Sequence, residues 1–268
     1  MRITTWNVNG LRAALRKGFA EELATISPDV LLLQEIRVLP EHLPESWAAP
    51  EGWHVTWHPA VRPGYAGTAV WSRVPHRVVS RGLTRRAGGE DPEGRVLRVK
   101  VQGLQLVSVY LPSGSSSPDR QAIKERWMAE FAPWAGAVRR SRTPTLLGGD
   151  LNIAHTERDI FYAKSNQNQS GFLPHERAWF GELLGSGWRD VVREAAGDVD
   201  GPYSWWSNRG QARAKDRGWR IDYLLANAPA AARVQRVTTH REAGLRCSDH
   251  APVSVDLAWH PEMADVDA

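Results

Sequence analysis

Acidic, amide and imidazole side chains stand at the ends of two apolar runs that lie far apart in the chain. Asp150 and Asn152 follow the first run, and Asp249 and His250 precede the second. Groups so widely separated act together only if a fold brings the ends of strands to one place. If it does, a carboxylate and an imidazole can move protons to and from an attacking water. The pattern therefore predicts a hydrolytic site.

Further polar residues occur in the same setting. Asn7, Glu35 and Tyr110 each stand at the end of an apolar run, and Asp222 lies within one. A strand-end residue taken alone is more often a cap for a turn or helix than a catalytic group. Asp222 differs because its apolar neighbours predict burial, and a buried carboxylate needs a partner. We expect that partner to be His250, whose ring the pairing would hold in one orientation.

Hydrolysis of a phosphodiester gives these groups complementary roles. Glu35 offers a hard oxygen ligand of the kind that Mg²⁺ prefers, and Asn7 and Asp249 would complete or orient the metal shell. Mn²⁺ is the alternative ion. A metal at this position would neutralise charge on the phosphate or on the leaving oxygen.

The remaining groups would handle the water and the protons. We expect Asp150 to orient and deprotonate an attacking water, and Asn152 to donate to that water or to the phosphate. His250 would stay protonated beside the phosphate. Tyr110 would add a neutral donor or, if its pKa falls, a source of protons.

The composition is that of a soluble globular protein. Of 268 residues, 42% are hydrophobic and 24% are charged. No apolar run approaches the roughly 18 residues of a membrane span, and the first residues lack the pattern of a secretion signal. Cys247 is the only cysteine, which excludes an intrachain disulfide and favours a cytoplasmic protein. No low-complexity linker divides the chain, so we predict one domain over residues 1–259 and a loose acidic tail over 260–268.

A basic segment rich in tryptophan suggests a polyanionic partner. The net charge of +4 and the pI near 9.4 favour such a partner only weakly. The local pattern is stronger, because basic groups interleaved with aromatic rings suit a surface that grips phosphates and stacks on bases. A solvated loop with core-anchored tryptophans would give the same pattern. The residues concerned are Trp205, Trp206, Arg209, Arg213, Lys215, Arg217, Trp219 and Arg220.

Short apolar runs and a few helical patterns define the expected fold. Strands are predicted at residues 3–8, 30–36, 54–58, 68–72, 96–101, 104–111, 145–148, 203–206, 220–226, 234–239 and 252–259, with a hairpin turn at Gly103. Helical patterns occur after residue 10, from 118 to 139 and from 174 to 184. This order is neither strict βαβ alternation nor all-β. It predicts an α/β fold in which two mixed sheets pack face to face with helices outside.

Four motifs in this order identify a family resemblance. The segments WNVNGLR (6–12), LLQE (32–35), GGDLNIAH (148–155) and SDHAPV (248–253) resemble the exonuclease III family of abasic-site endonucleases. That family is part of the endonuclease/exonuclease/phosphatase superfamily. The segments GFLPHER (171–177) and ARAKDRGWRIDY (212–223) are more specific to the DNA-repair members. The resemblance extends from Arg2 to Leu257.

The resemblance implies a four-layered, DNase I-like α/β sandwich and an enzyme of base excision repair. It implies cleavage 5′ to abasic sites in double-stranded DNA, removal of blocking groups from 3′ ends as a phosphodiesterase and phosphatase, and 3′→5′ exonuclease action. By position, the metal site falls on Glu35 with Asn7, Asp150, Asn152 and Asp249. The catalytic pair falls on His250 and Asp222, and the active-site tyrosine on Tyr110. Trp205, Trp219 and Ile221 match the pocket for the baseless sugar, beside the DNA-binding residues Arg209, Arg213 and Lys215.

Two departures from the family pattern concern the metal shell and the grip on DNA. Asn9 stands where some relatives carry an aspartate, and Ser113–Ser117 replaces longer polar or basic side chains. We expect a monomer that binds duplex DNA and no membrane. The alternatives are a phosphodiesterase of the same superfamily that acts on another phosphoester, and a non-catalytic DNA-binding relative.

Overall fold

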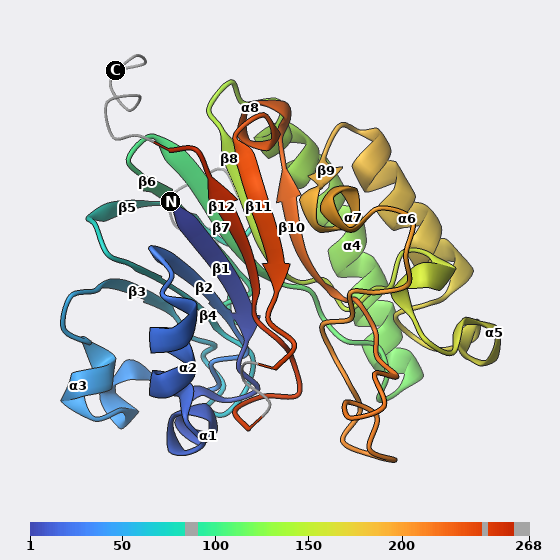
Figure 1. Ribbon diagram of the computed structural model, residues 1–268, viewed down its shortest axis with the longest axis horizontal. Helices are drawn as coiled ribbons and strands as arrows, with labels where there is room; N and C mark the ends of the chain where they lie inside the picture. The colour runs from blue at the N-terminus through green and yellow to red at the C-terminus, as the bar shows by residue number, and fades with distance from the viewer. Residues whose placement is uncertain (84–90, 243–245, 260–268) are drawn as a thin grey trace.

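Two six-stranded sheets form the centre of the molecule in a computed structural model that describes residues 1–83, 91–242 and 246–259 (Figure 1). The first sheet has the order β11-β12-β1-β2-β4-β3. Its strands are β11 (Val234–Thr239), β12 (Val253–Leu257), β1 (Arg2–Asn7), β2 (Val30–Gln34), β4 (Thr68–Ser72) and β3 (His54–His58). The second has the order β5-β6-β7-β8-β10-β9. Its strands are β5 (His76–Arg81), β6 (Val96–Val101), β7 (Leu104–Tyr110), β8 (Thr145–Asp150), β10 (Asp222–Ala226) and β9 (Arg189–Asp190).

Both sheets are mixed. β1 pairs in parallel with β2, and β7 with β8, while the other neighbours are antiparallel. The apolar face of each sheet meets the other in one core that includes Ile3, Leu32, Leu106 and Leu224. Central strands are buried on both faces, which is why they read as continuous apolar runs rather than as alternating patterns.

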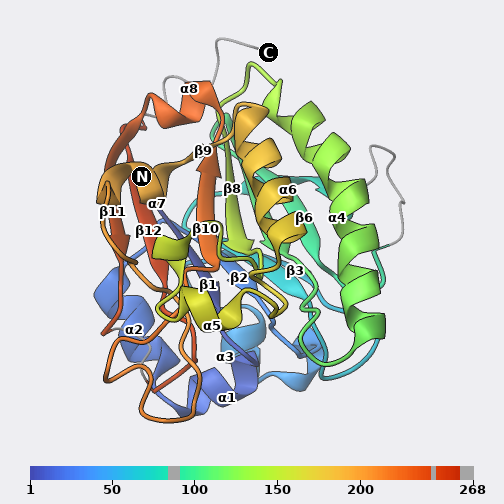
Figure 2. The same cartoon turned by 90° about the vertical axis from the view of Figure 1, so that its right-hand side faces the viewer.

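Helices cover the outer face of each sheet. Helices α4 (Pro118–Arg139) and α6 (Pro174–Gly185) lie side by side on the second sheet (Figure 2). Helices α1 (Leu11–Arg16) and α2 (Phe19–Ile26) pack on the first sheet around Trp6 and Trp71. The predicted four-layered α/β sandwich is therefore confirmed. The shorter helices are α3 (Glu45–Ala48), α5 (Ala163–Asn166), α7 (Val191–Ala196) and α8 (Ala228–Ala231). No helix among the described residues is long and apolar enough to cross a membrane.

The sequence predicted most elements but not all. Ten predicted strands and the helices at 118–139 and 174–184 lie where expected. Residues 203–206 are not a strand; Trp205 makes only isolated bridges to Trp219 and His250. The helical pattern after residue 10 is broken at Gly18, whose positive φ of 98° separates α1 from α2. β5 was not predicted because its partly exposed sequence lacks an apolar run. The predicted tail at 260–268 lies outside the described residues, and the single-domain organisation stays a prediction.

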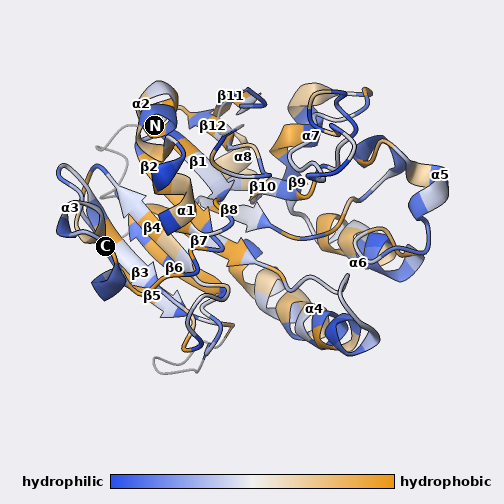
Figure 3. Ribbon diagram, turned by 90° about the horizontal axis from the view of Figure 1, so that it is seen from below, coloured by the Kyte–Doolittle hydropathy of each residue, from blue (hydrophilic) through white to orange (hydrophobic). Residues whose placement is uncertain are grey.

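The register of the strands brings the polar strand ends together. Asp150 pairs with Tyr110 on one side and with Asp222 on the other. Asn7 ends β1 beside Gln34, directly before Glu35. Figure 3 views the molecule from the end at which β1 terminates, with hydrophobic colour concentrated on the inner strands and hydrophilic colour on surrounding loops. The strands thus place Asn7, Tyr110, Asp150 and Asp222 at one end of the sandwich, with Glu35 directly after β2.

A buried ion-pair network holds the segment that leads into β10. The Asp159 carboxylate accepts from Arg220 at 2.7 Å and from Arg193 at 2.5 Å, and Arg220 also pairs with Asp190 at 2.8 Å. Burial alone would raise the pKa of Asp159, but the charge and hydrogen bonds of Arg220, with the Arg193 bond, lower it to about 2. Arg220 belongs to the basic segment predicted to grip DNA, and its burial excludes that role.

We expect Asp159→Asn to lower the free energy of unfolding by about 3–5 kcal/mol, because it removes the carboxylate shared by Arg220 and Arg193 and leaves the buried Arg220 charge with Asp190 alone. Chemical denaturation at pH 7 measures this loss. Because the pKa of Asp159 is lowered, its contribution to the free energy of unfolding is fully present above the ordinary aspartate pKa near 3.8. The contribution is lost as the pH falls through about 2. Asp198→Asn is the control, because Asp198 pairs with Arg158 at the surface and should change stability by less than about 1 kcal/mol. Equal effects of the two substitutions would contradict the role of the network.

Candidate active site

Asp150 is a buried carboxylate at the end of β8. Its Oδ2 accepts from Asn7 Nδ2 at 2.9 Å, and its Oδ1 accepts from the backbone N–H of Asn152 at 2.8 Å. His250 Nε2 lies 3.9 Å from the same Oδ2. Asp150 therefore faces an amide donor and an imidazole, as the sequence predicted.

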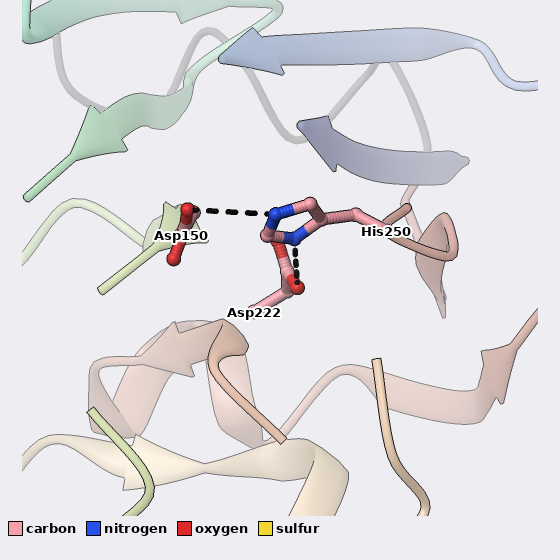
Figure 4. Close-up of side chains that lie close together, drawn as sticks. All are labelled: Asp150, Asp222 and His250. Atoms are coloured by element: carbon pink, nitrogen blue, oxygen red, sulfur yellow. Dashed lines mark hydrogen bonds and ion pairs between the residues drawn. The ribbon is translucent and has the colours of Figure 1, made fainter. Parts of the chain in front are cut away.

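His250 and Asp222 form the expected pair (Figure 4). His250 Nδ1 lies 2.9 Å from Asp222 Oδ2, which leaves Nε2 directed toward Asp150. Asp222 is held in turn, because Ser204 Oγ accepts the backbone N–H groups of Ile221 and Asp222 at 3.1 and 3.0 Å. Each ring nitrogen of His250 thus faces a carboxylate, and the orientation of the ring is fixed.

The charges of this cluster shift the pKa values of both His250 and Asp150. Burial lowers the pKa of His250, but the charge and hydrogen bond of Asp222, with the charges of Asp150 and Asp249, raise it to about 10. The imidazole is therefore protonated at neutral pH. Burial raises the pKa of Asp150 to about 7; His250 opposes the rise, while Asp222 and Glu35 add to it. A carboxylate that titrates near neutral pH is suited to take up a proton during a reaction.

Glu35 and Asn7 complete one side of the site. Asn7 Nδ2 bridges Glu35 Oε1 and Asp150 Oδ2, each at 2.9 Å, and the guanidinium of Arg37 pairs with Glu35. Glu35 has a φ of 50° and Asn152 a φ of 51°, a left-handed conformation that is uncommon outside glycine, although asparagine adopts it more readily than glutamate. Glu35 follows directly on β2 and Asn152 lies two residues after the end of β8, so the reversed backbone marks where the chain leaves each sheet. Such backbone exceptions concentrate at functional sites.

Asp249 lies on the opposite side and explains the Asn9 departure. Asn9 Nδ2 donates to Asp249 Oδ1 at 2.8 Å, and Trp205 Nε1 donates to Oδ2 at 3.0 Å. An aspartate in place of Asn9 would face Asp249 with a like charge and no donor. With asparagine at position 9, the site has one carboxylate fewer, and the Asn9 amide instead holds Asp249 in place by a hydrogen bond.

A cavity of about 380 Å³ opens above these groups. Trp205, Trp219 and Ile221 form an apolar wall, and the two indole rings meet edge to face with centroids 6.1 Å apart. The opposite wall carries Ser113 and Ser115 of the serine-rich loop. Asn7 and Asp222 lie behind the surface of the cavity, and the other predicted catalytic and metal-site residues line it: Glu35, Tyr110, Asp150, Asn152, Asp249 and His250.

Three of these groups are close enough to hold a metal ion. Ligand atoms of Asp150, Asp222 and His250 all lie within 4.8 Å of one another. Asp222 and His250 already bond to each other, however, and a protonated imidazole is not a ligand. On the side of Asp150 away from His250, the carboxylates of Asp150 and Glu35 are bridged by the Asn7 amide nitrogen and offer oxygen ligands, while the Asn7 oxygen accepts from the Asn9 N–H.

Comparisons with known proteins agree with this geometry. The model of the Endonuclease/Exonuclease/phosphatase family matches residues 4–250. This chain belongs to that family. An exodeoxyribonuclease of Bacillus subtilis is 34% identical over 95% of this chain and 98% of its own length. The DNA repair nuclease APEX1 of Danio rerio is 33% identical over 96% of this chain and 82% of its own length.

Solved structures of the family have the same fold. A 3′-5′ exonuclease (NExo) from Neisseria meningitidis superposes with a TM-score of 0.87 at 32% identity, over 97% of this chain and all of that one. The predicted DNase I-like architecture and the resemblance to exonuclease III-type nucleases are both confirmed. The roles of individual residues are not tested by these likenesses and stay predictions.

Tyr110 is fixed as a protonated phenol in this member of the family. Arg95 lies 4.7 Å from the ring centroid and donates to the Tyr110 carbonyl at 3.0 Å. Burial, followed by the charges of Glu35 and Asp150, raises the pKa of Tyr110 well above its ordinary value. The sequence left open a lowered pKa, and the structure favours the neutral donor instead.

The predicted DNA-binding cations lie in two different environments. Arg209 and Lys215 are exposed, and neither lines the cavity. Arg213 is half-buried: it donates to the carbonyls of Ser248 and Arg241 at 2.8 Å each and lies 4.7 Å from the Trp206 centroid. These contacts give Arg213 a packing role that fixes the segment before Asp249. Its contact with DNA stays a prediction.

Sequence reasoning missed a buried ion pair behind Asn152. Lys124 Nζ lies 2.6 Å from Glu176 Oε1, and both side chains are fully buried. Lys124 also donates to the Asn152 carbonyl at 2.9 Å, while Glu176 Oε2 accepts the N–H groups of Gly171 and Leu173 at 2.6 and 3.1 Å. The pair joins two helices to the strand end and to the wall of the cavity. The segment 171–177 was the available signal, although spacing gave no indication of its partner on α4.

We expect the His250 ring to remain protonated up to about pH 9 and Asp222→Asn to return its pKa toward the ordinary value, about 6.5, because the substitution removes the negative charge. Nitrogen-detected NMR titration in buffer with a chelator measures both. His240 is an internal control, since burial lowers its pKa and its ring bonds Ser254 elsewhere. A titration of His250 near 6.5 in the unsubstituted protein would contradict the pairing.

We expect Lys124→Met to cost about 3–5 kcal/mol of stability, because Glu176 loses its buried partner. Lys124→Met combined with Glu176→Gln should recover most of that loss, since Gln still accepts from Gly171 and Leu173. If the lysine also positions Asn152, the double variant keeps a kcat for phosphodiester hydrolysis about 10- to 100-fold lower, with KM little changed. Denaturation and steady-state kinetics separate the two effects. Recovery of both stability and kcat would reduce the pair to a stabilising role.

Proposed function

We propose that this chain is a Mg²⁺-dependent DNA-repair nuclease that cleaves the phosphodiester 5′ to an abasic site in duplex DNA. The observation that carries the proposal is the position of Asp150, between the charged His250–Asp222 pair and the Glu35 carboxylate, which the Asn7 amide N–H group links to Asp150, in the lining of a cavity with an apolar wall. We also propose action at 3′ ends, as a phosphatase, phosphodiesterase and 3′→5′ exonuclease. The names of the exodeoxyribonuclease and APEX1 relatives support this substrate class.

In the proposed mechanism, Asp150 orients a water and takes its proton. The pKa near 7 makes this carboxylate a stronger base than an exposed aspartate. His250 keeps a proton and a positive charge 3.9 Å from Asp150, which suits stabilisation of the phosphate as negative charge builds on its oxygens. Tyr110 donates a hydrogen bond as a neutral phenol, and the Asn152 amide orients the water or the phosphate.

The donor set fits Mg²⁺ better than a softer ion. Carboxylate oxygens come from Glu35, Asp150 and Asp249, with the Asn152 side chain on the same cavity, while the Asn7 amide orients Glu35 and Asp150 through its N–H group. Three carboxylates line the cavity, a surplus of negative charge that a divalent cation would offset. When bound, Mg²⁺ would neutralise charge on the phosphate and the leaving oxygen, and Mn²⁺ would substitute for it.

The apolar wall supplies the proposed preference for a baseless sugar. Trp205, Trp219 and Ile221 offer no hydrogen-bond acceptor toward the cavity and leave a volume of about 380 Å³. A sugar without its base can enter such a space after rotation out of the duplex, whereas an attached base meets the indole rings. A soluble or lipid phosphoester would not need this wall.

We expect the purified protein to incise a duplex that contains one abasic analogue in the presence of Mg²⁺ and not in EDTA, with a 3′-hydroxyl product. Asp150→Asn should lower kcat by at least about 100-fold, because the base for the water is lost. His250→Ala and Asp222→Asn should also lose catalysis while binding to the duplex persists. Gel-based incision and fluorescence anisotropy measure the two properties.

Asp198→Asn serves as the surface control and should cleave at the unsubstituted rate. Incision that is unaffected by EDTA, or equal in Asp150→Asn, would overturn the proposal. The alternatives are separated by competition: a soluble phosphoester hydrolysed without inhibition by duplex DNA would indicate another phosphodiesterase. Binding without any incision would indicate a non-catalytic relative.

A further inference from the structure

Two adjacent aromatic side chains stand exposed beside the cavity. Phe161 and Tyr162 are 47% and 48% exposed, and in the described ranges only Val61 and Val199 are large apolar residues of comparable exposure. The two rings meet edge to face with centroids 4.7 Å apart and an interplanar angle of 87°. Exposed apolar area of this kind is costly in water, and a neighbouring pair of rings marks a contact surface.

A cation holds the pair in position. The Arg217 guanidinium lies 5.7 Å from the centroid of each ring, so one positive charge faces both. Arg217 itself is exposed, as are Lys164 and Lys215 on the flanking segments. The rings and cations together form what we call the aromatic platform: Phe161, Tyr162 and Arg217.

The backbone under the platform is tied to the wall of the cavity. Phe161 N–H donates to the Gly218 carbonyl at 3.0 Å, and Ile160 bridges Trp219. Ile160 also packs in one cluster with Trp205, Trp219 and Ile221. Two residues of the aromatic platform are thus close in sequence to the cavity wall: Phe161 follows Ile160, which packs against the wall, and Arg217 comes two residues before Trp219, which is part of it.

The same segment separates two hollows. On one side, Asn166, Gln169 and Ser170 line the cavity above Asp150. On the other, Phe161, Tyr162 and Lys164 line a second hollow of about 900 Å³ that reaches Tyr203. The second hollow is also lined by the acids Glu157, Asp198 and Asp200, and Arg158 pairs with Asp198 at 2.6 Å and with Asp200 at 3.4 Å. A strand that leaves the first cavity over this segment therefore meets Lys164 and the half-exposed rings of Phe161 and Tyr162.

We propose that the aromatic platform binds an unpaired base of a DNA strand that extends from the cavity. The inference rests on the proposed function, because it takes DNA as the occupant of the cavity. A paired base cannot use these rings, since its faces are covered by its neighbours in the stack. An unpaired base has free faces, and stacking on aromatic side chains tolerates any sequence. The aromatic platform would thus favour substrates with frayed or single-stranded ends over intact duplex.

The test measures binding in EDTA by fluorescence anisotropy, with a blunt duplex and with duplexes that carry a three-base extension at the 3′ or the 5′ end. We expect the unsubstituted protein to bind one extended duplex more tightly than the blunt one, by about 5- to 150-fold. Phe161→Ala combined with Tyr162→Ala should remove that difference and leave the affinity for blunt duplex unchanged. A 2-aminopurine placed in the extension should lose fluorescence on binding only when both rings are present.

Controls separate stacking from charge and from folding. Val61→Ala combined with Val199→Ala removes exposed apolar area elsewhere and should change no affinity. The slope of log affinity against log salt should be the same in the Phe161/Tyr162 double variant, because no charge is lost. Incision of an internal abasic analogue in blunt duplex should also be unchanged.

Two outcomes would overturn the inference. Equal affinity of the double variant and the unsubstituted protein for every duplex would leave the rings without a role in DNA binding and point to a protein partner. Loss of affinity for blunt and extended duplex alike would make them a general duplex contact. Failure of the proposed function gives a different result: no incision of the abasic duplex by the unsubstituted protein, whatever the binding data show.

Discussion

The burial of Asp150 between two neighbouring strands is the constraint on which the site depends. β8 delivers this carboxylate into a space without bulk water, where an isolated negative charge costs many kcal/mol. Three groups stabilise this charge: the Asn7 amide at the end of β1, a backbone N–H in the turn that follows β8, and a charged imidazole. None of these donors lies near Asp150 in sequence except the turn. The arrangement around Asp150 therefore depends on the packing of the two sheets, which brings these donors to it.

Two further sets of buried, paired charges hold the loops around the site. Asp159 with Arg220 and Arg193 ties the entry of β10, and Lys124 with Glu176 ties the exit of β8. Each network connects a strand end to a loop that also packs through buried apolar residues such as Ile160 and Phe172. Buried ion pairs contribute little net stability compared with apolar packing, but they tolerate few alternative arrangements. Their value here lies in placing Asp222 and Asn152 to within a hydrogen-bond length.

The sequence was sufficient for the fold and for most of the polar residues that the structure brings together at one cavity, for a physical reason. Central strands buried on both faces give continuous apolar runs, and polar residues at their ends stand out against that background. Asp222 could be assigned as buried because it lies within such a run. Residues 203–206 were misassigned because their aromatic content resembles a strand, whereas Trp205 is held by isolated bridges and by its bond to Asp249. Arg220 and Lys124 could not be assigned, since spacing in sequence does not indicate which buried acid a cation will face.

Asn9 and the serine-rich loop show that residues around the cavity can vary while the buried charges of Asp150, Asp222 and His250 stay in place. Asn9 exchanges a negative charge for a donor to Asp249, so the carboxylates around the cavity repel one another less before any cation binds. The short hydroxyls of Ser113 and Ser115 leave one wall of the cavity without cations of its own. The exposed rings of Phe161 and Tyr162 and the Arg217 cation lie instead on neighbouring segments, outside the lining of the cavity. Burial constrains the central charged residues, whereas the solvent-exposed residues of the walls are less constrained. Differences in substrate range within this architecture should therefore arise in the loops that carry the walls, while the strand ends remain the same.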